Sequence, residues 1–164
     1  SGVTLYQQRD NTMQTRTVQM PARKRIALIA HDNMKPVLTS WAQQHLDVLQ
    51  QHQLFATGTT GHRLARDLGL NISTLVSGPL GGDQQIGAML VDQQIDLIIF
   101  FWDPFEPQPH DPDVKALLRV AAVWNVAVAC NRSSADFMIQ SLPMAQPYDY
   151  EIPDYQAYLQ ERLG

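Results

Sequence analysis

The chain of 164 residues contains a single cysteine, Cys130. One thiol cannot close a disulfide within the chain, and it cannot supply the thiolate cluster of a structural zinc site. Scarcity of cysteine is typical of proteins that work in a reducing compartment. We therefore expect a cytoplasmic protein.

Long apolar runs and an excess of positive charge are also lacking. The most apolar stretch, residues 95–102, is much shorter than the roughly 20 residues that cross a bilayer. The chain also opens without the charged and apolar segments of a signal peptide. Because the formal net charge is −4, there is no broad basic field for nucleic acid. We expect neither a membrane nor a nucleic acid as partner.

The composition is that of an ordinary globular enzyme, with 45% hydrophobic and 17% charged residues. The length suits one domain with a substantial core. Residues 1–20 are polar and show no periodic pattern, so we expect an irregular arm there and a single domain over residues 21–164.

Apolar segments alternate with segments of helical spacing along the rest of the chain. The predicted strands cover residues 25–30, 53–56, 71–76, 95–101 and 126–130. Helices are predicted at residues 34–52, 84–92 and 113–124, and another follows the loop at residues 57–61 and ends at about Leu68. A short helix capped by Ser133 or Ser134 and a last helix capped by Asp154 are also predicted. This alternation predicts an α/β fold, a doubly wound parallel sheet of about five strands with helices on both faces and flavodoxin-like layering.

Polar loops follow the predicted strands. They cover His31 and Asp32, residues 57–61, residues 77–83, and the proline-rich stretch 102–113. Ligands bind doubly wound sheets beyond the carboxyl ends of the strands. These loops are therefore expected to meet on one rim.

Two of the loops combine glycine with hydroxyl side chains, at residues 57–61 and 77–83. Glycine allows a close approach of the backbone to a ligand, and the first N–H groups of the following helix are available to an anion. Lys35 can add a positive charge. A phosphate group suits such a rim, although either loop alone could be an ordinary tight turn.

Asp83 directly follows one of these loops, where it could serve as a helix N-cap or as a proton acceptor. His31 and His110 lie in rim loops and could donate to a developing oxyanion. No tight metal-ligand spacing such as His-x-x-x-His occurs, so an acid/base site without metal is favoured. The residues alone indicate a small phosphorylated ligand and a proton transfer.

Five motifs together resemble the bacterial methylglyoxal synthases. They are ALIAHD at 27–32, ATGTTG at 56–61, SGPLGGDQQIGA at 77–88, FFWDP at 100–104 and HDPDVKALLR at 110–119. The resemblance extends from about Arg23 to the C-terminus. It implies a lyase that converts dihydroxyacetone phosphate to methylglyoxal and inorganic phosphate with no metal or organic cofactor.

The resemblance also implies roles for individual residues. Asp83 would be the catalytic base, and His110 would lie near the substrate oxygens. The residues implied to bind substrate and phosphate are His31, Lys35, Thr57, Gly58, Thr59, Thr60, Ser77 and Gly78. Supporting carboxylates would be Asp32, Asp103 and Asp113, and Arg162 would contact another subunit.

The family further implies a homo-oligomer, a hexamer, that is inhibited by phosphate. Two other readings remain open at this point. Domains similar to these synthases also act as regulatory modules that bind phosphorylated ligands without catalysis. A signalling receiver is a third reading, but the end of the first strand lacks the paired acids that a receiver needs, and Asp83 with His110 favours the enzyme.

Overall fold

The structure, a computed structural model, describes residues 13–109 and 111–164. Its centre is a parallel sheet of five strands in the order β4-β3-β2-β5-β6. The strands are β2 (Arg25–Ala30), β3 (Gln53–Thr57), β4 (Ile72–Leu75), β5 (Leu97–Phe101) and β6 (Ala127–Ala129). The prediction of a doubly wound α/β fold is confirmed.

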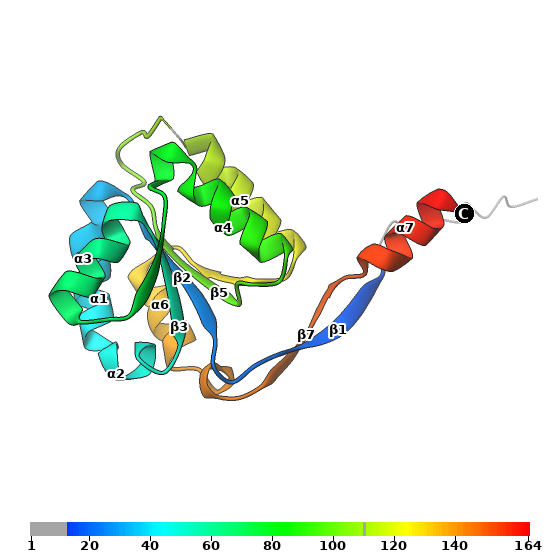
Figure 1. The fold of residues 1–164 in the computed structure, drawn as a ribbon, viewed down its shortest axis with the longest axis horizontal. Helices are drawn as coiled ribbons and strands as arrows, with labels where there is room; N and C mark the ends of the chain where they lie inside the picture. The colour runs from blue at the N-terminus through cyan, green and yellow to red at the C-terminus, as the bar shows by residue number, and fades with distance from the viewer. Residues whose placement is uncertain (1–12, 110) are drawn as a thin grey trace, which may run out of the picture.

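Helices cover both faces of this sheet (Figure 1). On one face lie α1 (Lys35–Gln44), α2 (Leu46–Leu49), α3 (Gly58–Leu68) and α6 (Arg132–Ile139), and on the other lie α4 (Gly82–Val91) and α5 (Asp111–Val123). Strand β2 contributes to both cores, because Ile26 and Leu28 pack with the first set of helices and Ala27 and Ile29 with the second. Burial on both faces explains why its sequence is a continuous apolar run.

The order of the strands places a switch in winding direction between β2 and β5. From β2 the chain proceeds outward through β3 and β4, and it then crosses to the other side of β2 to form β5 and β6. Helices on opposite faces diverge at such a point and leave a crevice at the carboxyl ends of the strands. His31 follows β2 at this crevice, and its N–H donates to the carbonyl of Phe101 at 3.1 Å.

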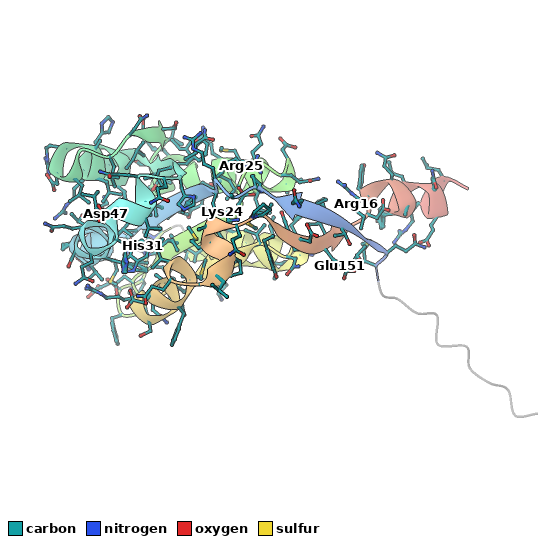
Figure 2. The ribbon with its side chains drawn as sticks, turned by 90° about the horizontal axis from the view of Figure 1, so that it is seen from below. Arg16, Lys24, Arg25, His31, Asp47 and Glu151 are labelled. Carbon is teal, nitrogen blue, oxygen red and sulfur yellow. The ribbon has the colours of Figure 1, made fainter. Side chains whose placement is uncertain are left out.

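An ion pair fastens the opposite end of the same two strands. The Arg25 guanidinium donates to the Asp96 carboxylate at 3.1 and 3.0 Å, and the Arg25 backbone N–H donates to it at 2.8 Å. Figure 2 shows Arg25 and His31 toward opposite ends of β2. These contacts hold the start of β2 against the start of β5. The crevice lies at the carboxyl ends of the same strands.

A ribbon of two antiparallel strands extends from this body. It pairs β1 (Thr15–Met20) with β7 (Tyr148–Pro153), so that Thr15 lies opposite Pro153 and Met20 opposite Tyr148. The ribbon leads away from the sheet, and α7 (Tyr155–Leu163) lies at its far end (Figure 1). No residue of α7 is buried. Asp154 caps this helix as predicted, accepting from the Ala157 N–H at 3.0 Å.

Three local predictions differ from the structure. The irregular arm predicted over residues 1–20 does not describe Thr15–Met20, because pairing with β7 gives this polar segment its backbone hydrogen bonds; residues 1–12 lie outside the described part. The helix predicted over residues 34–52 is two helices, separated where His45 leaves helical geometry at φ −114° and ψ 25°. Asn131, rather than Ser133 or Ser134, caps α6 by accepting from the Ser134 N–H at 2.9 Å.

Candidate active site

A recess of about 260 Å³ opens at the crevice between the strand ends. We call it the rim recess. It is built from the loops after β2, β3 and β4, the first turn of α4 and one residue of the proline-rich loop. Its lining residues are Ile29, Ala30, His31, Asp32, Lys35, Thr57, Thr59, Thr60, Ser77, Gly78, Pro79, Asp83 and Gln108. The predicted convergence of the rim loops is therefore observed.

The two glycine loops of the rim recess touch one another, and glycine is needed for that contact. Gly58 has φ +25°, and a Cβ there would lie 2.1 Å from Ser77 Oγ. A Cβ on Gly82 would lie 2.8 Å from Thr57 Cγ2 in the other loop and 2.2 Å from the Val76 carbonyl oxygen. Helices α3 and α4 begin at these loops, and the first N–H groups of a helix have no partner within the helix and favour an anion. An anion is therefore the natural occupant of the recess beside these loops.

Asp83 lies in the first turn of α4 and is only 2% exposed. It is not the N-cap, because Gly81 takes that position with φ +107° and no side-chain cap bond forms. Asp83 is among the residues that line the rim recess. The positive end of the helix dipole favours the charged carboxylate in this position.

His31 is held by the loop that follows β5. The backbone N–H of Asp103 donates to His31 Nδ1 at 3.0 Å, which places the proton of the neutral ring on Nε2. The Asp103 carboxylate accepts from Asn33 Nδ2 and from the Phe105 N–H, both at 2.9 Å. These hydrogen bonds, led by that of Asn33, lower the pKa of Asp103. The backbone of Asp103 thus holds the His31 ring, and Asp103 is not among the residues that line the recess.

Lys35 stands at the start of α1 with its ammonium fixed by two neighbours. Its Nζ donates to Asp32 Oδ1 at 2.6 Å and to Thr59 Oγ1 at 2.5 Å. The Asp32 side chain is 92% exposed, whereas that of Lys35 is 15% exposed. This arrangement positions one permanent positive charge at the edge of the recess, beside the glycine loop that starts α3.

Not every described residue that the sequence analysis expected at the site lines the recess, since Gly58, like Asp103, is absent from the lining. Asp113 lies in the first turn of α5, outside that lining. His110 lies outside the described residues. Arg162 is on α7 at the end of the ribbon, with its guanidinium 4.7 Å from the centre of the Tyr158 ring. The roles assigned to these three residues stay predictions, as do the roles of the predicted residues that line the recess.

Gln108 lines the recess and was not predicted. Its backbone N–H donates to Asp111 Oδ2 at 3.0 Å, which ties the proline-rich loop to the start of α5. The signal in the sequence is slight, since Gln108 is simply a polar residue between two prolines in a loop that follows a strand.

Two further findings concern other classes of site. Over residues 13–109 and 111–164, no group of three or more His, Cys, Asp or Glu side chains is placed to hold a metal ion. None of the helices in these same ranges has the length and apolarity to span a membrane.

Comparison with known proteins places this geometry in a family. The model of the MGS-like domain matches residues 37–130. The chain is 61% identical over 150 residues to methylglyoxal synthase of Saccharophagus degradans, covering 92% of this chain and 97% of that protein. It is 54% identical over 151 residues to methylglyoxal synthase of Vibrio parahaemolyticus, covering 92% of this chain and all of the relative.

A solved structure agrees with the sequence matches. The crystal structure of methylglyoxal synthase from Elizabethkingia anophelis superposes with a TM-score of 0.83 at 51% sequence identity. The match covers 88% of this chain and 95% of that one. Sequence, fold and family model agree over most of the chain, and the chain therefore belongs to the methylglyoxal synthase family.

Proposed function

We propose that the protein converts dihydroxyacetone phosphate to methylglyoxal and inorganic phosphate in the rim recess, with Asp83 as the catalytic base. The observation that carries this assignment is the position of Asp83. It is a buried carboxylate that lines a recess between two glycine loops suited to phosphate, with Lys35 at the edge. A proton acceptor and a phosphate cradle are thus adjacent on one rim.

The chemistry begins with a proton transfer. The Asp83 carboxylate removes a proton from the hydroxymethyl carbon, which leaves an enediolate on the substrate. Donors must stabilise the negative oxygens that develop. The Nε2–H of His31 supplies one such donor, because Nδ1 is occupied by the Asp103 N–H, and His110 is proposed as a second.

Elimination completes the reaction. The electrons of the enediolate expel phosphate by breaking the carbon–oxygen bond to the phosphate group, and the resulting enol becomes methylglyoxal. The departing phosphate is held by Lys35, by Thr57, Thr59, Thr60 and Ser77, and by the amides near Gly58 and Gly78. The bond that breaks must lie roughly perpendicular to the enediolate plane, so the loops that fix the phosphate also govern the outcome.

A non-catalytic binding module of the same fold is the alternative, and it is not favoured. The curated relatives at 54% to 61% identity are named as synthases, and the chain covers nearly their whole length.

The direct test is release of methylglyoxal and phosphate from dihydroxyacetone phosphate by the wild type and by Asp83→Asn. We expect turnover in the wild type and at least a thousandfold loss of kcat in Asp83→Asn, because the amide cannot accept the proton. Asp92→Asn, at the C-terminal end of the same helix, is the matched control and should keep its activity. Comparable kcat in the Asp83 variant and the control would remove Asp83 as the base.

The family resemblance supports three further proposals. We propose that the chain works as a homo-oligomer, a hexamer, in which Arg162 contacts another subunit. Inorganic phosphate, the product, is proposed to inhibit the enzyme. The cytoplasm is the proposed location, in keeping with the single cysteine.

A further inference from the structure

A second pocket lies at the other end of the sheet from the rim recess, where the ribbon joins the body; Figure 2 shows Lys24 in this region. Its volume is about 270 Å³. Lys24, which directly precedes β2, lines it together with Met20 at the end of β1 and Tyr148 at the start of β7. We call it the ribbon-base pocket. Among the described residues, none with a proposed role in the reaction lines it.

The walls of the ribbon-base pocket are largely apolar. Their buried members are Met20, Leu97, Val126 and Met144. Leu97, Met144 and the half-buried Met138 also line a much smaller cavity of about 10 Å³, which they share with the buried Trp41. Methionine side chains are flexible and fit themselves to irregular apolar shapes. Three methionines around one pocket therefore suit a ligand with an apolar chain.

A buried ammonium group lies among these apolar walls. Lys24 is 1% exposed, and its Nζ donates to the carbonyl oxygens of Pro21 and Gln146, both at 2.7 Å. Pro21 follows β1 and Gln146 precedes β7, so the lysine fastens both strands of the ribbon to the body at their base. An ammonium has three N–H groups, and these two carbonyls are its acceptors within residues 13–109 and 111–164. The third N–H can bind a ligand.

The positive charge at this place exceeds the negative charge. Burial lowers the pKa of the Lys24 amine, and the negative charge of Asp96 opposes that effect only in part. The Asp96 carboxylate is itself engaged by the Arg25 guanidinium at 3.1 and 3.0 Å. Two cations, Lys24 and Arg25, thus share one carboxylate. Because a buried charge is costly unless it is paired, the ribbon-base pocket favours an anion beside Lys24.

We propose that the ribbon-base pocket binds a medium-chain monocarboxylic acid, with its carboxylate on the Lys24 ammonium and its chain against the methionines. An ammonium and a carboxylate form a strong, charge-assisted hydrogen bond. The volume lies just below the roughly 300–1,000 Å³ of pockets for drug-sized ligands, which favours a small molecule over a whole lipid. A phosphate dianion suits the pocket less, because its oxygens would lose their hydration against apolar walls.

This binding site goes beyond the proposed function and does not depend on it. Its test therefore uses no turnover. Octanoate is titrated into the intact protein by calorimetry, with two comparison ligands. Octanol keeps the chain and lacks the charge, and butanoate keeps the charge on a shorter chain.

Two variants alter the ribbon-base pocket independently. Lys24→Met removes the ammonium, and Ala127→Phe adds a ring at an exposed lining position while the ammonium stays in place. Lys115→Met and Ala122→Phe are the matched controls, because they make the same changes at exposed positions of α5 that do not line the pocket. The thermal midpoint without ligand shows whether each variant is folded. Ala127→Phe decides the proposal if loss of Lys24 unfolds the chain.

We expect one octanoate per chain in the wild type and in both controls. Binding should be about tenfold weaker in Lys24→Met and in Ala127→Phe. Octanol and butanoate should bind the wild type at least tenfold more weakly than octanoate, since each buried CH₂ strengthens binding about fourfold. Absence of saturable octanoate binding to the wild type, as would follow if another copy of the chain covers the pocket, would overturn the proposal. Equal affinities in all five proteins would do the same.

Discussion

The Nδ1 nitrogen of His31 is held by the loop that follows β5, and the Nε2–H is the group that we propose donates to the substrate. Its Nδ1 accepts the Asp103 N–H at 3.0 Å, and the ring meets Phe100 edge to face with centres 5.5 Å apart. Two substitutions of His31 separate these functions. In His31→Asn the side-chain oxygen can take the place of Nδ1, and in His31→Gln the amide nitrogen can take the place of Nε2.

We expect His31→Asn to keep a thermal midpoint near that of wild type while kcat falls about a hundredfold, since a donor to the enediolate is lost. His31→Gln should lose about 1 kcal/mol of stability because the Asp103 N–H loses its acceptor, and it should keep more activity than the asparagine variant. Thermal unfolding and steady-state kinetics measure both effects. The reverse ranking of the two kcat values would exclude the Nε2–H as that donor.

His52 links protonation to stability at the far end of the sheet. It is buried, and its Nδ1 accepts the Lys24 N–H at 2.8 Å. Burial, assisted by the positive charges of Lys24 and Arg23, lowers its pKa from the ordinary 6.5. In the window between the folded pKa and 6.5 the unfolded chain binds more protons than the folded one, so stability falls as the pH falls through that window.

His52→Asn should reduce this dependence, because the asparagine oxygen can accept the same N–H and does not titrate. Denaturant unfolding at several pH values between about 7.5 and 5 measures the difference. The wild type should lose more stability than the variant on acidification. Parallel curves for the two proteins would show that His52 is protonated alike in the folded and unfolded states.

At the scale of elements, the contact between the β3–α3 and β4–α4 loops creates the phosphate side of the rim recess. Gly58→Ala would place a methyl group 2.1 Å from Ser77 Oγ, at a backbone φ of +25°. The loops must separate to relieve this clash. We expect a loss of about 1–3 kcal/mol in stability together with a rise in KM as the phosphate cradle opens.

Gly69→Ala provides the matched control. Gly69 ends α3 with φ +67°, and no atom lies within 4 Å of the position of an added Cβ. This substitution strains the backbone without moving the loops, so KM should stay at its wild-type value. Equal rises in KM for the two variants would show that the Gly58 effect is not local to the contact.

The sequence predicted a strand or helix correctly where burial imposes a periodic or continuous apolar pattern on the residues. The central strands β2 and β5 are apolar runs because helices and neighbouring strands cover them. The rim loops could be placed together because parallel strands end on one edge. Strands β1 and β7 escaped prediction, since their pairing partner lies more than a hundred residues away and their sides are mostly exposed.

The candidate site was likewise predicted only in part from the sequence. Glycine and hydroxyl residues in the two loops identified the anion side, and the resemblance singled out Asp83. The sequence could not show that Gly81 would take the N-cap position and leave the Asp83 side chain to the recess. Gln108 was missed because its place depends on the path of a proline-rich loop, which no periodic pattern encodes.

At the scale of the whole molecule, the ribbon and α7 stand out from the body as elements that lack a core of their own. The nine residues of α7 include none that is buried, and Leu163 at its end is 81% exposed. A helix shorter than about 12 residues is marginal in water without packing. We expect a second copy of the chain to cover this helix in the proposed oligomer.

Removal of residues 155–164 should therefore lower the mass in solution and leave the body folded. Light scattering after size exclusion measures the mass, and the thermal midpoint reports on the body. We expect the intact chain to be a hexamer and the shortened chain to be smaller. Arg162→Gln, which keeps the helix, distinguishes loss of one contact from loss of the whole element. A full-size assembly after the truncation would mean that α7 is not needed for association.

The pairing of β1 with β7 also sets an order of events during synthesis. Thr15 meets Pro153, so β1 has no partner in the ribbon until β7 has been synthesised, whereas β2, β3 and β5 can pair earlier. Contacts between distant residues form late because a long loop must first close. The body thus has time to fold before the ribbon exists. Any association through the ribbon is therefore delayed until β7 has been synthesised.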